Sequence, residues 1–270
     1  MAGPRGLGGM IIRWRNGRIE DEPAEAAAPT DWGAFTTAGC DRGRPLLWSR
    51  HLLRLSATLA NLGAVNDPVL PTEIELCDLL DAAGLEGPAR VRVVARRVDP
   101  LLWNIEASAS SCDAVGPETR PTRLMVQQWP SAPPLAGHKT LARLPWDLAR
   151  EKAQQQGYDD VLLTDSEDNL LETSVANVWV LKNGVLRTPP APDRCLPGVM
   201  RGWLLENLHR ADLVAEVGEL ALDDLVSAEE VWLSNAIVGV RRVGGIGEEQ
   251  WRDWPRFDLL NNLGVPAPGW

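Results

Sequence analysis

The stretch GYDDVLLTDSEDNLLETSVANVWVLKNGVLRTPP, residues 157–190, decides the fold of the second half of the chain. It holds three runs, DVLLTD, LLETSVANVWVL and VLRTP, in which apolar and β-branched residues are frequent, and such runs are typical of short strands. Asn183 and Gly184 stand between the last two runs, and Asn-Gly is the strongest short signal for a hairpin turn. The stretch therefore predicts a sheet built from short strands.

Helices and a further strand are predicted around this sheet. PWDLAREKAQQQG, residues 145–157, and the segment 198–209 have the spacing of helices, and EVWLSNAIVGVRRV, residues 230–243, has that of a strand. The Pro-rich segment WPSAPPLAG, residues 129–137, precedes them and is interpreted as a linker. These features predict a C-terminal domain, residues 138–270, that is mostly β with helices.

The first half of the chain mixes both kinds of element. WSRHLLRLSATLANLG, residues 48–63, has leucines at helical spacing and ends at a glycine. Thr72 and Glu75 form a capping-box pattern at the start of a second helix that runs to about Gly84. Strands are predicted in ARVRVVARRV, LLWNIEAS and TRLMVQQW. We therefore predict an N-terminal α/β domain over residues 10–128 and an overall α/β (α+β) fold of two domains.

The composition argues against several classes of protein. A net charge of −10 on 270 residues disfavours nucleic acid as a partner, because nucleic-acid-binding proteins gather basic residues on one face. No apolar run is long enough to cross a bilayer, and the opening MAGPRGLGGMII lacks the long apolar core of a secretion signal. The four cysteines and three histidines are dispersed, which predicts free thiols and no metal site. We expect a soluble cytoplasmic protein.

Lysine is scarce, and this narrows the search for a reactive amine. The chain has three lysines, Lys139, Lys152 and Lys182. Lys182 precedes the Asn-Gly turn and Lys152 lies among polar residues of a predicted helix, so both are expected at the surface. Lys139 follows the linker, and clefts between domains are favoured sites for small molecules. Taken alone, however, Lys139 fits an ordinary surface lysine better than a reactive one.

Several motifs in a fixed order change that interpretation. They are HKTLARL at 138–144, GYDDVLLTD at 157–165, LLETSVANVWVLKNGVLRTPP at 170–190 and LPGVMR at 196–201. In order and spacing they resemble the class IV aminotransferase family, and AFTTA and HLLRL in the first half are similar to signatures of the same family. The resemblance extends from about Asp31 to Val243. It implies fold type IV of the pyridoxal-phosphate enzymes, with the cofactor in the cleft between two domains, and a homodimer.

The resemblance assigns roles to individual residues. It implies that Lys139 binds pyridoxal 5'-phosphate covalently through its amine and, once substrate has displaced it, moves protons there. Glu172 matches the carboxylate that hydrogen-bonds the pyridine nitrogen, and a negative partner keeps that nitrogen protonated. Asn177 is expected to support the ring or its carboxylate partner. The cofactor phosphate is expected to lie among Arg54, Gly198, Val199, Met200, Ser234, Asn235 and Ala236.

Candidates for substrate contacts come from both halves of the chain. Arg90 and Arg92 alternate on a predicted strand and share a face, where they either bind an anionic substrate or are solvated. Arg143, in HKTLARL, is a further candidate for substrate binding. Thr36 or Thr37, in AFTTA, is a catalytic candidate that would position the leaving part of the substrate, although a threonine in a strand is more often structural.

The choice of reaction depends on finer details of the motifs. The family includes branched-chain aminotransferases, D-amino-acid aminotransferases and 4-amino-4-deoxychorismate lyases. AFTTA, HKTLARL and SNAIVGV are more similar to the lyase versions, and the single tyrosine, Tyr158, rules out a pocket lined by tyrosines. The resemblance thus implies a lyase that eliminates pyruvate from 4-amino-4-deoxychorismate and leaves 4-aminobenzoate, a step of folate biosynthesis. Three alternatives stay open: an aminotransferase for branched-chain or D-amino acids, a cofactor-binding protein without turnover, and a binding domain without cofactor.

Overall fold

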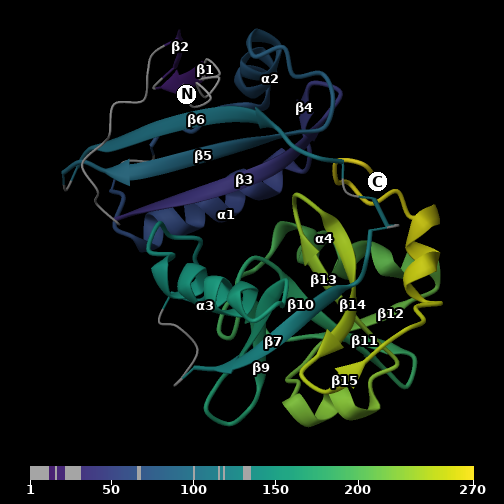
Figure 1. The fold of residues 1–270 in the computed structure, drawn as a ribbon. Coiled ribbons are helices and arrows are strands. Elements are labelled where there is room, and N and C mark those ends of the chain that lie inside the picture. The colour runs from purple at the N-terminus through teal and green to yellow at the C-terminus, as the bar shows by residue number, and fades with distance from the viewer. Residues whose placement is uncertain are drawn as a thin grey trace, which may run out of the picture.

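Two sheets form the framework of the molecule, one above the other in Figure 1, and each has its own apolar core. The fold is mixed α/β in two domains, as predicted. The computed structural model describes residues 12–15, 17–21, 32–65, 68–99, 101–114, 116–117, 119–129 and 135–270. Within these residues, no helix combines the length and apolar character needed to cross a membrane.

Six strands and two helices build the first domain. They are β1 (Ile12–Arg15), β2 (Arg18–Asp21), β3 (Gly33–Asp41), β4 (Arg44–Pro45), α1 (Trp48–Asn61), α2 (Glu73–Ala82), β5 (Ala89–Arg97) and β6 (Trp103–Ser111). The strand order is β2-β1-β6-β5-β3-β4, and all neighbours are antiparallel. The predicted capping box starts α2, because the Thr72 hydroxyl accepts from the Glu75 amide and the Thr72 amide donates to the Glu75 carboxylate.

Nine strands build the second sheet, which contains parallel and antiparallel pairs. They are β7 (Thr122–Gln128), β8 (Asp160–Thr164), β9 (Leu170–Thr173), β10 (Asn177–Lys182), β11 (Val185–Thr188), β12 (Val214–Val217), β13 (Glu230–Asn235), β14 (Gly239–Ile246) and β15 (Glu249–Gln250). The order is β12-β11-β10-β13-β14-β7-β8-β9, with β15 paired to β14. Asn183 and Gly184, both at positive φ, join β10 to β11 in the predicted hairpin.

Helices cover this sheet and supply its core with further apolar side chains. They are α3 (Leu144–Gln155), α4 (Val199–Asn207) and the 3-10 helices η1 (Leu208–Ala211), η2 (Leu222–Ser227) and η3 (Phe257–Asn262). α3 buries Ala149 and Ala153 near β7 and β8. Trp179 and Trp232 are fully buried in the main core, which α4 also contacts. Both helices predicted in this half of the chain are therefore present.

The domain boundary lies earlier in the chain than predicted. β7 was expected in the N-terminal domain, residues 10–128, but it pairs in parallel with β8 and β14 and so belongs to the second sheet. These pairings bury Leu124 completely in the second core. Such contacts join residues far apart in sequence, so the local pattern of β7 does not reveal them. The predicted linker, residues 129–137, is thus a connection within the second domain, and residues 130–134 lie outside the described part.

Two segments predicted as continuous strands are broken by turns. LLETSVANVWVL divides into β9 and β10, and the turn between them closes where the Thr173 amide donates to the Ala176 carbonyl at 2.8 Å. EVWLSNAIVGVRRV divides into β13 and β14, whose turn is fixed by the Asn235 side-chain oxygen accepting from the Ile237 and Val238 amides at 2.9 Å. An Asn side chain that replaces backbone partners in this way favours a turn. Both turns line the pocket described below.

The segment that follows the connection ties the two domains together. The Phe35 amide of β3 donates to the Lys139 carbonyl at 2.9 Å, and the Leu141 amide donates to the Gly33 carbonyl at the same distance. Ala34 and Thr140 thus form an isolated β-bridge between the domains. A Cβ at Gly33 would lie 2.4 Å from the Ala95 carbonyl oxygen, so this close approach requires glycine. The backbone that follows the Lys139 side chain is therefore held by β3.

Candidate active site

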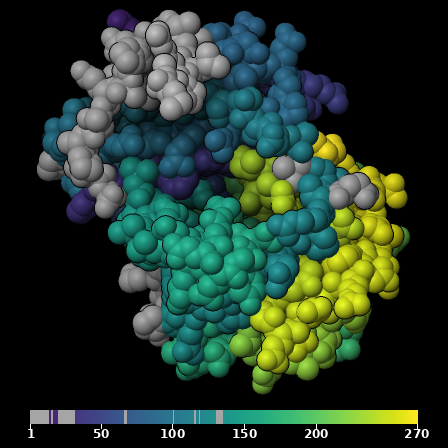
Figure 2. Space-filling view, in the orientation of Figure 1, coloured from purple at the N-terminus to yellow at the C-terminus, as the bar shows by residue number. Residues whose placement is uncertain are grey.

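A pocket of about 450 Å³ lies between the two domains, and Figure 2 shows the surface hollowed where they meet. Its lining includes predicted residues of both domains. From the first domain come Thr37, Arg54, Arg90 and Arg92. From the second domain come Lys139, Arg143, Glu172, Asn177, Gly198, Val199, Ser234, Asn235 and Ala236. Nearly all the candidates, which are scattered over 200 residues of sequence, are therefore brought to one site.

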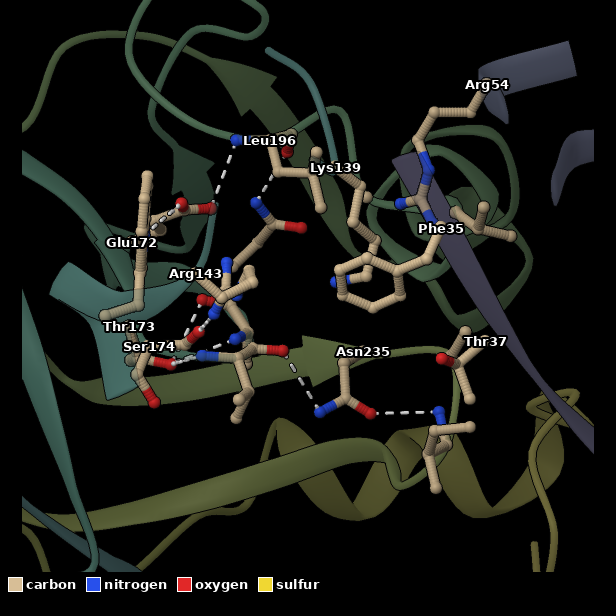
Figure 3. Close-up of a pocket in the computed structure, with 18 of the residues that line it drawn as sticks. Phe35, Thr37, Arg54, Lys139, Arg143, Glu172, Thr173, Ser174, Leu196 and Asn235 are labelled. Carbon is tan, nitrogen blue, oxygen red and sulfur yellow. Dashed lines mark hydrogen bonds between the residues drawn. The ribbon is translucent and has the colours of Figure 1, made fainter. Parts of the chain in front are cut away.

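Lys139 is the lysine that the structure places in this pocket. Its Nζ lies 4.9 Å from the centre of the Phe35 ring (Figure 3). Burial, together with the positive charges of Arg54 and Arg143, lowers the pKa of Lys139 to about 7. Lys152 is exposed on α3, and Lys182 donates to Asp224 at 2.8 Å away from the pocket. A lysine with this pKa has a neutral, nucleophilic amine for much of the time near pH 7.

Glu172, at the end of β9, is buried and held by a donor on each oxygen. Its Oε2 accepts from the Leu196 amide at 3.1 Å, and its Oε1 accepts from the Trp146 indole N–H at 3.3 Å. Burial raises the pKa of Glu172, while the Leu196 hydrogen bond and the charge of Lys139 act in the opposite direction. Figure 3 shows Glu172 and Arg54 on opposite sides of Lys139.

Arg54 lies at the other side of the pocket, close to the start of α4. Its Nη1 donates to the Pro197 carbonyl at 3.5 Å and its Nη2 to the Thr36 hydroxyl at 3.1 Å, while its Nε has no partner in the described part of the chain. Among the described residues, no carboxylate lies within ion-pair distance of this buried guanidinium. Burial lowers the pKa of Arg54 to about 10. A buried cation beside a helix N-terminus is an environment that favours an anion.

The start of α4 packs closely against β10. The Asn177 side-chain amide donates to the Leu196 carbonyl at 2.8 Å. A Cβ at Gly198 would lie only 2.0 Å from the Asn177 Oδ1, so glycine is required for this approach. We call Arg54, Glu172, Asn177 and Gly198 the inner end of the pocket. At the inner end, backbone and side-chain hydrogen bonds set the positions of the polar groups.

Two predicted residues do not line the pocket. Met200 has its side chain fully buried in the core of the second domain, because α4 turns this position toward the sheet. Thr36 is also fully buried, and its hydroxyl bonds to Arg54 and to His51 instead of facing the cavity. Thr37, the next residue of β3, lines the pocket because successive strand residues point to opposite faces. Ser234 lines it too, while its hydroxyl accepts from Trp179 at 2.9 Å.

Three arginines form a further part of the lining, which we call the arginine rim: Arg90, Arg92 and Arg143. Arg92 stacks over the Phe35 ring at 3.8 Å, Arg90 donates to Ser110 at 3.0 Å, and Arg143 donates to the Ser174 carbonyl. None of the three has a carboxylate within ion-pair distance among the described residues. Burial lowers the pKa of Arg92 and of Arg143.

Phe35, Trp146 and His51 are among the residues of the site that were not predicted. Phe35 and Trp146 line the pocket, and His51 lies behind it. Phe35 was part of the quoted AFTTA motif and His51 part of HLLRL, so their motifs marked the region without giving them a role. Trp146 carries no spacing signal, because its contact with Glu172 joins the start of α3 to a strand 26 residues away. No group of acidic, His or Cys side chains suited to a metal occurs in the described part of the chain.

The pocket fits a ligand that carries a phosphate, a carbonyl carbon and a basic ring nitrogen. Arg54 and the start of α4 suit the phosphate, since the guanidinium lacks a carboxylate partner among the described residues. Lys139 supplies an amine of lowered pKa for the carbonyl carbon. Glu172 supplies an oriented carboxylate for the ring nitrogen. These complementary groups are those of pyridoxal 5'-phosphate.

Comparison with known proteins gives the class to which this chain belongs. Residues 33–246 match the model of the amino-transferase class IV family, and the chain therefore belongs to this family of pyridoxal-phosphate enzymes. The match spans both domains and includes all the motifs that suggested it. The cofactor inferred from the residues of the pocket is thus the cofactor of the family.

Particular relatives include lyases and aminotransferases. The chain is 34% identical over 143 residues to an aminodeoxychorismate lyase of Vibrio harveyi, an alignment that covers 53% of this chain and 51% of that protein. It resembles the crystal structure of 4-amino-4-deoxychorismate lyase from Pseudomonas aeruginosa, with 25% identity, a TM-score of 0.73 and coverage of 93% and 97% of the two chains. It shares its fold with the Escherichia coli branched-chain amino acid aminotransferase, with 20% identity, a TM-score of 0.82 and 96% coverage of each chain.

Proposed function

We propose that this protein is a pyridoxal-phosphate-dependent lyase that converts 4-amino-4-deoxychorismate into 4-aminobenzoate and pyruvate, a step of folate synthesis. The atoms of the substrate are divided between the two products, so the reaction requires no second substrate. The observation that carries the proposal is the arginine rim. It provides cations for a substrate that bears two carboxylates, one on the ring and one on the enolpyruvyl ether.

The charge of the pocket supports a dianionic substrate. Five cationic side chains line it against two carboxylates, Glu172 and Asp147. A bound phosphate offsets part of this excess at Arg54, which leaves the arginine rim to attract and orient the substrate. Arginine suits this task because its planar fork matches the geometry of a carboxylate. A branched-chain amino acid, whose side chain is apolar, would make little use of these cations.

The residues of the pocket have defined parts in the proposed reaction. When bound, pyridoxal phosphate supplies the electron sink that makes a C–H bond next to an amino group acidic. Lys139 Nζ takes the ring proton beside the substrate nitrogen, which its pKa of about 7 allows, and returns a proton to the departing pyruvate. Glu172 holds a negative charge at the ring nitrogen, where its two donors fix its orientation. Arg54 anchors the phosphate.

The relatives support the lyase without deciding between it and an aminotransferase. The Vibrio harveyi protein is an aminodeoxychorismate lyase, and the chain spans about half of its length in the alignment. Branched-chain aminotransferases also match, over about a third of the chain. The arginine rim favours the lyase. We further propose that the protein acts in the cytoplasm, in keeping with its four free cysteines, and that it is a homodimer, as is implied by the family.

The proposal is tested by incubating the purified, cofactor-loaded protein with 4-amino-4-deoxychorismate and measuring 4-aminobenzoate and pyruvate. Both products are expected in equal amounts, with the cofactor spectrum unchanged after turnover. If no pyruvate forms, and an amino donor instead converts the bound cofactor to its amine form, the protein is an aminotransferase. A protein that binds the cofactor but is inert to both substrates is a binding protein. The Lys139→Ala variant serves as the negative control.

A further inference from the structure

We propose that Thr36 and His51 form a buried pair that orients Arg54 for the cofactor phosphate, so that Thr36 is a positioning residue and not a catalytic one. The proposal rests on the role of Arg54 proposed above. It concerns residues that lie behind the pocket wall, where neither can touch substrate. Both side chains are completely inaccessible to solvent.

The three side chains form a continuous chain of hydrogen bonds between β3 and α1. The Thr36 Oγ1 lies 2.7 Å from His51 Nδ1 and accepts from Arg54 Nη2 at 3.1 Å. His51 stands one turn before Arg54 on α1, and its ring stacks on Trp48 with 18° between the planes. This packing fixes the imidazole, and the imidazole in turn fixes the rotation of the threonine hydroxyl.

The directions of these hydrogen bonds follow from the chemistry of the groups. A guanidinium can only donate, so the Thr36 oxygen accepts from Arg54. In the proposed arrangement the hydroxyl proton points to His51 Nδ1, which accepts it as the unprotonated nitrogen of a neutral ring that carries its proton on Nε2. Burial and the charges of Arg54 and Lys139 lower the pKa of His51 and maintain this neutral form. The threonine lone pairs are thereby directed at Arg54.

This arrangement explains how an arginine with few other partners is held in place. The remaining contact of the Arg54 guanidinium is a long one, 3.5 Å from Nη1 to the Pro197 carbonyl. Without Thr36, the side chain would be free to turn away from the start of α4. A phosphate would then have to order the guanidinium on binding, and the conformational entropy that the Arg54 side chain loses would weaken the binding of the phosphate. Pyridoxal, which lacks the phosphate, would not be affected.

The first test compares pyridoxal phosphate with pyridoxal on Thr36 variants. Thr36→Val keeps the volume and removes the hydroxyl, whereas Thr36→Ser keeps the hydroxyl. We expect Thr36→Val to bind pyridoxal phosphate about 10- to 150-fold more weakly, the range for one hydrogen bond to a charged group, and to bind pyridoxal within about twofold of the wild type. Thr36→Ser should restore most of the loss. Affinities are measured by titrating the apoprotein and following the visible absorbance of the bound cofactor.

Thr188 offers a matched control for effects on folding. It is also a fully buried threonine whose hydroxyl accepts from an arginine, Arg201, at 3.3 Å, but it does not line the pocket. Thr188→Val should therefore lower thermal stability much as Thr36→Val does, while the ratio of the two affinities stays that of the wild type. Equal weakening of pyridoxal phosphate and pyridoxal in Thr36→Val would overturn the proposal and leave Thr36 a purely structural residue.

The second test distinguishes failure of this proposal from failure of the Arg54 assignment. His51→Asn places an amide oxygen near the position of Nδ1 and should accept from Thr36, whereas His51→Leu cannot. We expect the loss of phosphate-specific affinity in His51→Leu and its partial recovery in His51→Asn. Arg54→Leu is made in parallel. If Arg54→Leu leaves the ratio of the affinities for pyridoxal phosphate and pyridoxal unchanged, Arg54 does not bind the phosphate. If Arg54→Leu lowers this ratio and His51→Leu does not, Thr36 and His51 do not position Arg54.

Discussion

The inner end of the pocket and the arginine rim are both polar, but they are built in different ways. At the inner end, Glu172 has a donor on each oxygen and Asn177 is bonded to the backbone before α4. At the rim, the Arg92 guanidinium has no hydrogen-bond partner among the described residues and rests on the Phe35 ring. A preset end suits a ligand that stays bound, and a side chain as free to adjust as that of Arg92 suits a ligand that is exchanged at each turnover.

The largest effect is expected at Lys139, which lines the same pocket as both regions. Lys139→Ala should lower turnover of 4-amino-4-deoxychorismate by about 10³-fold or more, because it removes the proposed proton carrier together with the covalent attachment of the cofactor. The exposed Lys152→Ala on α3 is the control and should behave as the wild type. Pyruvate release by Lys139→Ala at a rate near that of the wild type would contradict the proposed mechanism for both regions.

A substitution in the arginine rim should weaken the binding of substrate and should not change the affinity for the cofactor. Replacing Arg92 by leucine removes a charged donor, and about 2–3 kcal/mol of substrate binding should be lost, or roughly 30- to 150-fold in kcat/KM. The affinity for pyridoxal phosphate should not change. Arg252→Leu, an exposed arginine outside the pocket lining, is the control. If Arg92→Leu instead weakens cofactor binding and leaves the kinetics for bound substrate intact, the division between rim and inner end is wrong.

A substitution at the inner end of the pocket should instead weaken the binding of the cofactor. In Gly198→Ala, the new Cβ would lie 2.0 Å from the Asn177 Oδ1, so the start of α4 must shift. Crowding of this kind costs about 1–2 kcal/mol, and cofactor affinity should fall roughly 5- to 30-fold. Gly202→Ala is a matched control in the same helix, because its Cβ would meet nothing nearer than the Arg50 Nη1 at 3.5 Å. Equal cofactor affinity in the two variants would show that α4 does not bind the phosphate.

Local signals in the sequence predicted the elements better than the way they assemble. The capping box of Thr72 and the Asn183-Gly184 hairpin are present because a few neighbouring residues determine them. β7 was assigned to the wrong domain because its partners, β8 and β14, lie about 40 and 120 residues further along the chain. The turns at 174–176 and 236–238 were missed because the apolar pattern continues through them.

The same distinction applies to the site. Lys139 and Glu172 were predicted from motifs in a fixed order, and the structure places both in the lining of one pocket. The sequence did not separate Thr36 from Thr37, although the alternation of a strand sends one behind the wall and the other into the cavity. Trp146 could not be found, since only the packing of α3 against β9 brings its N–H to Glu172.

The smallest expected effect, a change in a pH profile, tests whether both regions act on Lys139 together. Its pKa is lowered by burial and by cations of both regions, Arg54 from the inner end and Arg143 from the rim. The neutral amine becomes available as pH rises through about 7, so the rate at which the apoprotein captures pyridoxal phosphate should increase about threefold from pH 6.5 to 7.5 and little above that. An ordinary lysine would gain about tenfold per pH unit up to pH 10. Removing one cation in Arg143→Leu should move the bend to higher pH, and a bend that stays in place would show that the rim does not contribute to the lowered pKa through Arg143.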